Sequence, residues 1–136
     1  MRTILSLAFP LSLALLGCGP KTVYTDLDVP RLGKLDDLMW AQAQATDPQF
    51  KKIGASSYTD GDYEAFVAVA GRLKLTAERL KEPAYSKGDG WNKLADQLAQ
   101  QGADLGAAGS AKDAAKSSQA LAAIKGTCKG CHKQFR

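Results

Sequence analysis

The chain has 136 residues, of which 45% are hydrophobic and 24% charged, so it allows one modest domain and excludes two large ones. The formal net charge of +4 is a mild excess without a basic block, and nucleic acid is therefore not expected as a partner. The chain has three cysteines and one histidine. Cys18 belongs to the N-terminal signal described below, and the three residues that remain are too few for the four ligands of a zinc ribbon.

The N-terminus has the pattern of an export signal. Arg2 gives it a positive start, and the apolar stretch Ile4–Leu16 has the length of a signal-peptide core. That stretch is too short to span a bilayer. We therefore expect the protein to leave the cytoplasm.

The apolar stretch ends in Leu-Leu-Gly-Cys at 15–18, which resembles the lipobox of bacterial lipoproteins. The resemblance implies cleavage after residue 17 and lipidation of Cys18, with a membrane tether facing the periplasm of a Gram-negative bacterium. The alternative is an ordinary secretory signal. The domain organisation we expect is a signal peptide at 1–17, a tether at 18–29 and a folded domain at 30–136.

Four helices are predicted after the tether, because no segment alternates with period two and Ala, Leu, Lys and Gln dominate. The first covers about 30–45, since Pro30 suits a first turn and the residue before Pro48 avoids the helical region. The second runs from the capping-box pair Thr59 and Asp62 to about residue 81.

The third predicted helix starts near Trp91 and ends in a turn at 106–109. The fourth begins with the capping-box spacing of Ser110 and Asp113. Its apolar stripe is spaced by three and four residues and consists of Leu121, Ile124, Cys128, Cys131 and Phe135.

Four such helices with short connections predict an all-α fold, an antiparallel up-down-up-down bundle. This topology brings the start of the first and third helices to the same pole as the end of the second and fourth. The end of the fourth helix should therefore face residues 35–40, Leu80 and Trp91.

The chemistry is indicated by Cys128-Lys129-Gly130-Cys131-His132, because Cys-x-x-Cys-His is the attachment signal of c-type haem. On a helix, Cys128, Cys131 and His132 share one face, as the edge of a planar cofactor requires. His132 is the only histidine, so a haem attached here would use it as the proximal ligand.

Other interpretations of the two cysteines are weaker. A redox pair of this spacing belongs with alternating strands and helices, which the sequence does not predict. A disulfide between residues i and i+3 of a helix is geometrically awkward. The remaining hypothesis is a helical lipoprotein without haem.

The sequence resembles the cytochrome c prime family, four-helix-bundle c-type cytochromes with the haem motif at the C-terminus. The residues that carry the resemblance are Gly88-Asp89-Gly90-Trp91 and the run from Ala122 through the motif to Phe135 and Arg136. The resemblance implies one covalent haem c, with thioethers from Cys128 and Cys131, iron on His132 and Arg136 beside the proximal imidazole. It also suggests a homodimer built on the first two helices.

The residue opposite His132, on the first helix, separates two functions in that family. Met39 shares a stripe with Leu32 and Leu35 and could be a soft sixth ligand, which suits an electron carrier. Methionine is also a routine core residue, and Leu35 or Leu38 could instead cap an open iron that binds nitric oxide or carbon monoxide.

The aromatic and basic residues near the motif complete the prediction. Phe135 is expected to pack on the porphyrin, and Trp40 and Trp91 either stack on it or are simply core. Lys129 and Lys133 could steer acidic redox partner proteins or could simply form a solvated charged face. Because no catalytic triad, carboxylate pair or phosphate loop is recognisable, we expect a single-electron carrier and not an enzyme.

Overall fold

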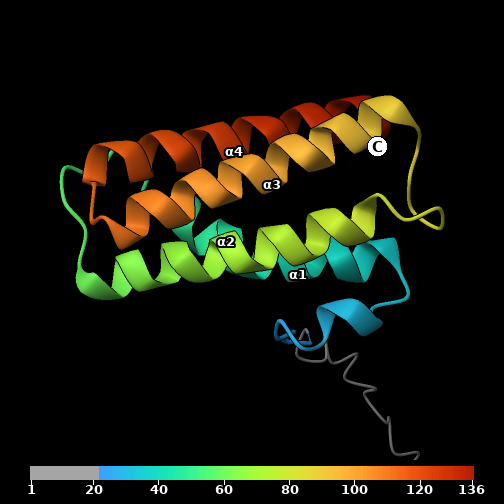
Figure 1. The fold of residues 1–136 in the computed structure, drawn as a ribbon, viewed down its shortest axis with the longest axis horizontal. Coiled ribbons are helices and arrows are strands. Elements are labelled where there is room, and N and C mark those ends of the chain that lie inside the picture. The colour runs from blue at the N-terminus through green and yellow to red at the C-terminus, as the bar shows by residue number, and fades with distance from the viewer. Residues whose placement is uncertain (1–21) are drawn as a thin grey trace, which may run out of the picture.

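In the computed structural model, residues 22–136 form four long helices that run alternately up and down (Figure 1). The helices are α1 (Leu35–Phe50), α2 (Asp60–Leu80), α3 (Asp89–Ser110) and α4 (Ala114–Phe135), preceded by the short 3-10 helix η1 (Val29–Arg31). No strand occurs in this range. The predicted all-α, antiparallel four-helix bundle is confirmed.

Residues 1–21 are outside the described part, so the expected signal peptide at 1–17 and Cys18 are outside it too. Within residues 22–136, no helix has the length and apolar character needed to cross a bilayer.

Two clusters of buried side chains form the core. The first contains Phe66 and Leu73 of α2, Leu105 of α3 and Ile124 of α4, all fully buried. The second, around Leu38 of α1, lies toward the pole where α4 ends, because Cys131 and Phe135 pack against it. The haem motif is therefore continuous with the core.

The start of α2 confirms the predicted capping box. The Thr59 side chain accepts a hydrogen bond from the Asp62 N–H at 3.2 Å, and the Thr59 N–H donates to the Asp62 carboxylate at 2.9 Å. The ammonium of Lys52 also lies 2.5 Å from this carboxylate. The hydrogen bonds from Lys52 and Thr59 lower the pKa of Asp62 from 3.8 to about 2.

The turn predicted at 106–109 is wrong, because α3 continues to Ser110. Gly106 and Gly109 face α2 closely: a Cβ at Gly106 would lie 2.8 Å from the Cβ of Ala70, and one at Gly109 would lie 3.1 Å from the carbonyl of Tyr63. These glycines allow two helices to approach each other, and neither of them ends a helix.

The turn is made by Lys112, whose φ of 52° is in the left-handed region. The Lys112 N–H donates to Gly109 O and the Asp113 N–H to Ala108 O, the two bonds of a Schellman motif. The predicted cap at Ser110 is consequently wrong: Ser110 ends α3, and Asp113 caps α4 by accepting from the Lys116 N–H at 3.0 Å.

The predicted bounds of the first helix also need correction. Pro30 lies in η1 and α1 begins only at Leu35. At the other end, α1 continues through Pro48 to Phe50. Packing of Phe50 against the first core cluster outweighs the backbone preference of the residue before proline.

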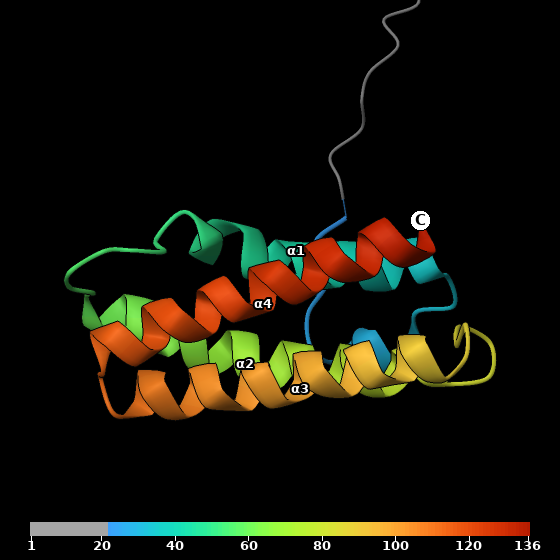
Figure 2. The same ribbon diagram turned by 90° about the horizontal axis from the view of Figure 1, so that it is seen from above.

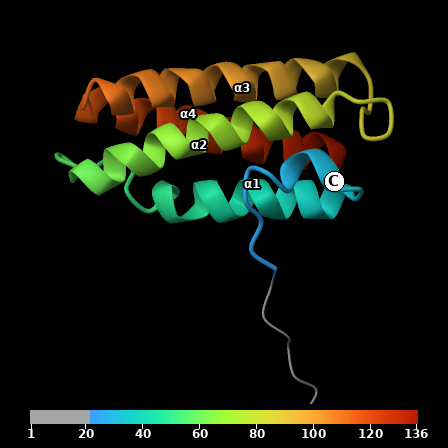
Figure 3. The same cartoon turned by 60° about the horizontal axis from the view of Figure 1, so that its bottom comes forward.

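The sequence analysis expects a tether at 18–29, but residues 22–29 of it pack on the bundle. Val29 is fully buried, and the segment from Thr22 onward lies across α1 and α2 (Figure 3). The described part of the expected tether is thus packed on the bundle.

Helix α4 packs mainly on α3 and α1 mainly on α2, whereas α1 and α4 touch only lightly. Figure 2 shows the C-terminal end of α4 beside the start of α1. The two helices that contact each other least therefore lie side by side at the pole where α4 ends.

Replacing Gly106 by Ala should destabilise the bundle by about 1–3 kcal/mol, because the added methyl group meets the Cβ of Ala70 and pushes α2 and α3 apart. Gly126→Ala is the matched control: nothing lies within 4 Å of its added Cβ, and it should stabilise α4 by about 0.4–1 kcal/mol. Urea unfolding of both variants measures the difference. Equal stability of Gly106→Ala and the unchanged protein would contradict the close helix approach.

Acid should remove the contribution of Asp62 to stability. Its pKa is lower in the folded state, so this contribution is complete above about pH 4 and is lost as the pH falls toward 2. The unfolding free energies of the unchanged protein and Asp62→Asn, compared from pH 5 to pH 2.5, should therefore converge. A difference that stays constant over this range would show that the carboxylate is not held by Lys52 and Thr59.

Candidate functional site

A cavity of about 450 Å³ opens between α1 and the end of α4. Its volume is in the range of small-molecule sites. It is lined by Leu35, Asp36, Met39, Trp40, Ala43, Lys87, Trp91, Cys131, His132, Phe135 and Arg136. The predicted meeting of the α4 end with residues 35–40 and Trp91 is therefore confirmed.

A smaller pocket of about 30 Å³ lies deeper in the bundle and shares Met39, Trp91, Cys131 and His132 with the main cavity. The residues that only the deeper pocket contacts are Gln42, Leu80, Leu94, Ala95, Leu98, Thr127 and Cys128. Most of these side chains are apolar. The two cavities together form one cleft that reaches from the surface to the core.

The three residues of the haem motif lie on this cleft. Cys128 and Cys131 are half-buried free thiols, and His132, at the mouth, is exposed. Their spacing of three and four residues puts them on one face of α4. Burial, and to a lesser extent the neighbouring Cys131, raises the pKa of the Cys128 thiol to about 11.

Two aromatic rings close one side of the cleft. The Trp91 indole N–H donates to Leu80 O at 2.6 Å, which fixes this buried ring at the start of α3. The Phe135 ring meets it edge-to-face, with the ring centroids 5.4 Å apart. Both predicted aromatic residues therefore line the site as part of a single wall.

Lys87 is a site residue that the sequence analysis missed. It belongs to the α2–α3 connection, and its ammonium donates to Phe135 O at 2.8 Å and lies 5.3 Å from the centre of the Trp91 ring. With Arg136 and Asp36 it forms a charged rim around the cavity. Its place just before Gly88-Asp89-Gly90 was a signal that it lies at this pole, but the direction of its side chain was not predictable.

Helix α1 supplies the wall opposite α4. Met39 is half-buried and lines both parts of the cleft, as His132 does. Leu35 lines the outer cavity only. The alternative prediction that Leu38 caps an open iron is wrong. Its fully buried side chain belongs to the second core cluster and does not line the cleft.

The donor set fits a covalently attached haem. Two thiols, an imidazole and a thioether meet in one mostly apolar cleft whose walls come from α1, α3 and α4. Thiols are the groups that form thioether links, and imidazole and thioether are the ligands of c-type haem iron.

The sequence model of the family described as Cytochrome C' matches residues 42–136, which is more than half of the chain. The chain belongs to the cytochrome c' family. The family implies a covalently bound haem c, which agrees with the donor set of the cleft. The match begins at Gln42, so it does not include Met39.

Among individual proteins, the chain is similar to a cytochrome c' of Pararhodospirillum photometricum, with 38% identity over 66 residues. The aligned part is 48% of this chain and 53% of the relative, so the chain spans about half the length of that protein. No solved structure matches the chain.

Proposed function

We propose that this member of the cytochrome c' family carries single electrons in the periplasm, with one haem linked to Cys128 and Cys131. His132 would be the proximal ligand of the iron. When bound, the haem supplies an iron that exchanges one electron or binds a small gas. The observation that carries the proposal is that Met39, Cys131 and His132 line the same cleft.

The chain's own residues give the site its properties. Helix α4 presents both thiols and the imidazole on one face, so attachment needs no rearrangement of its backbone. Trp91 and Phe135 give one side of the cleft an aromatic, apolar wall. An apolar, partly closed site keeps the redox potential under the control of the protein.

Met39 is proposed as the second axial ligand. It lines the cleft from α1, the wall opposite the helix that carries His132. A thioether is soft and neutral, stabilises the reduced iron and suits electron transfer.

The alternative function is capture of nitric oxide or carbon monoxide at an iron without a sixth protein ligand. One observation favours it: the α1 wall of the outer cavity also contains Leu35 and Ala43, neither of which can bind iron. In that case Met39 would be an apolar wall residue.

Location and partners are part of the proposal. The lipobox-like sequence ending at Cys18 supports a lipid anchor on the periplasmic side of a membrane. The exposed Lys87, Lys129, Lys133 and Arg136 at or near the mouth of the cleft would attract acidic redox partner proteins.

Haem attachment is tested by the intact mass of the exported protein. We expect the polypeptide mass plus one haem, retained after denaturation. Cys128→Ala should leave a single thioether, seen in the spectrum of the pyridine complex, and Cys128→Ala with Cys131→Ala should lose the covalent haem. Lys129→Ala, inside the motif, is the matched control and should keep it. A colourless exported protein without added mass would overturn the proposal.

The role of Met39 is tested by carbon monoxide. If Met39 binds iron, the spectra are low-spin in both oxidation states and become high-spin in Met39→Ala. Carbon monoxide should then bind reduced Met39→Ala at least about tenfold faster than it binds the reduced unchanged protein. The reason is that Met39 would leave the iron in only a minor fraction of the unchanged molecules. Leu35→Ala, on the same wall, should stay low-spin. Fast binding to the unchanged, high-spin protein would instead establish gas binding.

A further inference from the structure

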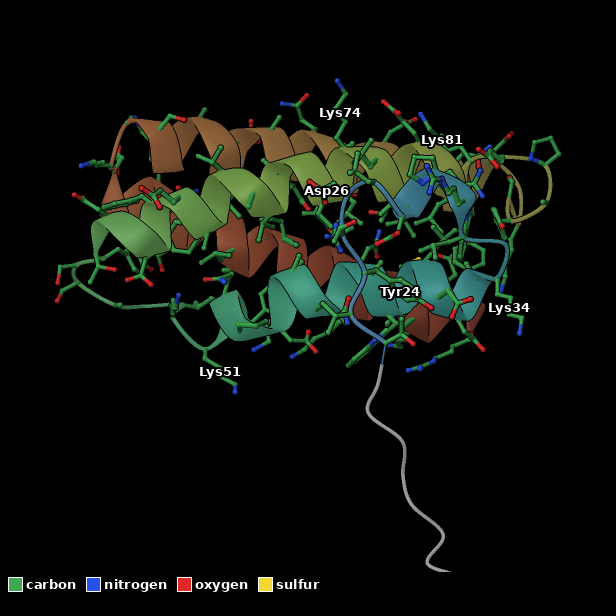
Figure 4. The ribbon with its side chains drawn as sticks, turned by 90° about the horizontal axis from the view of Figure 1, so that it is seen from below. Tyr24, Asp26, Lys34, Lys51, Lys74 and Lys81 are labelled. Atoms are coloured by element: carbon green, nitrogen blue, oxygen red, sulfur yellow. The ribbon has the colours of Figure 1, made fainter. Side chains whose placement is uncertain are left out.

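Residues 22–28, which we name the strap, lie across α1 and α2 (Figures 3 and 4). Residues 26–28 form a turn, in which the Asp28 N–H donates to Thr25 O at 3.1 Å. The Thr22 carbonyl accepts from the Trp40 indole N–H at 2.7 Å and from the Gln44 amide at 2.6 Å. The Tyr24 N–H donates to the Gln44 side-chain oxygen at 2.9 Å. The backbone of the strap is therefore fixed to α1 from its first described residue.

Two polar side chains of the strap, those of Tyr24 and Asp26, contact the bundle, whereas Thr25 and Asp28 hydrogen-bond to each other. The Tyr24 hydroxyl donates to Asp37 at 3.0 Å, and Asp26 pairs with the buried Arg72 of α2. Arg72 also donates to Tyr24 O at 3.0 Å and to Ala41 O at 2.9 Å. One guanidinium thus joins the strap, α1 and α2.

The apolar side chains of the strap point the other way. Val23 is 79% exposed and Leu27 is 81% exposed, and the only other large hydrophobic side chain exposed among the described residues is Val67 at 43%. A segment that packs on a bundle and faces water normally turns its large apolar side chains inward. The strap has the reverse arrangement, which indicates that its outer side meets something less polar than water.

We infer that the outer side of the strap rests on a phospholipid bilayer, with Val23 and Leu27 in the lipid interface. The inference rests on the lipid anchor proposed above for Cys18. Three residues lie between Cys18 and Thr22, and the four steps from one Cα to the next span at most about 14 Å, so an anchored chain keeps the strap beside the membrane.

The charges around the strap fit the same partner. Figure 4 shows Lys34, Lys51 and Lys74 extending outward at the rim of this face. Lysines at the rim of an apolar contact complement anionic lipid phosphates. The face across α1 and α2 is also the one that the family resemblance offers to a homodimer, and here the strap covers it.

Docking in this orientation has a consequence for the haem site. Trp40 lines the outer cavity and donates a hydrogen bond to Thr22 O, so the α1 wall of the cleft lies next to the strap.

The test uses the full holoprotein, in which Cys128 and Cys131 carry haem and Cys18 carries lipid, so that an introduced cysteine is the only free thiol. Leu27→Cys is compared with Ala103→Cys, an exposed position on α3. Figure 3 shows α3 on the other side of the bundle from α1, the helix to which the strap is hydrogen-bonded. Both are reconstituted on vesicles of phosphatidylethanolamine and phosphatidylglycerol and treated with a membrane-impermeant maleimide.

We expect Leu27→Cys to react at least about tenfold more slowly than Ala103→Cys on vesicles, as for a site open in under a tenth of the molecules. The two rates should become equal in detergent. Equal rates on vesicles overturn the inference. If Leu27→Cys still reacts slowly in detergent, and reacts more slowly still as the protein concentration rises, a second copy of the chain covers this site and the inference is overturned.

Sedimentation of the same samples separates this inference from the proposals before it. If the protein pellets with vesicles but Leu27→Cys and Ala103→Cys react at equal rates, the strap contact is contradicted and the lipid anchor is supported. Protein that stays in the supernatant contradicts the anchor and the strap contact together. The haem spectrum of each sample reports the redox function independently of both results.

Discussion

The close approach of α2 and α3 is the constraint on which the rest of the bundle depends. Gly106 and Gly109 put bare backbone against α2, where even a methyl group would meet Ala70 or the Tyr63 carbonyl. Gly102 does the same against Leu73, with 3.1 Å between an added Cβ and the Leu73 Cβ. These contacts make α2 and α3 the tightest helix pair, and the other two helices pack onto it.

The cleft follows from this arrangement. Because α4 packs on α3 and α1 on α2, the outer pair is free to separate at the pole where α4 ends. The Trp91 ring, held by its bond to Leu80 O, fills the base of the gap. The cleft lies where α1 and α4 pack least closely, and its mostly apolar walls suit a large flat cofactor with apolar faces.

Arg72 joins the N-terminal segment to α1 and α2. It is buried between α1 and α2 and uses its donors on Asp26, Tyr24 O and Ala41 O. A buried guanidinium is costly unless each donor is satisfied, so the strap is part of the folded domain and not an appendage. Through Thr22 and Trp40 the strap also reaches the wall of the cleft.

The site was predictable from local spacing, and much of the fold from periodicity. The positions of Cys128, Cys131 and His132 on one helical face follow from their spacing alone. The bundle topology then placed Trp91 and residues 35–40 opposite them. The turn at 106–109 was not predictable, because glycine serves equally as a helix end and as a point of close helix contact, and only the partner helix distinguishes the two.

The sequence by itself determined the helical class, the α2 cap and the cofactor, since each depends on residues within a few positions of one another. Tertiary structure decided that Leu38 is core while Met39 faces the cleft, because one residue of helix register turns a side chain by about 100°. It also decided that the Lys87 side chain lies at the rim of the cavity and that residues 22–28 pack on the bundle with Val23 and Leu27 exposed. Both placements depend on hydrogen-bond partners about 20 to 50 residues away in the sequence.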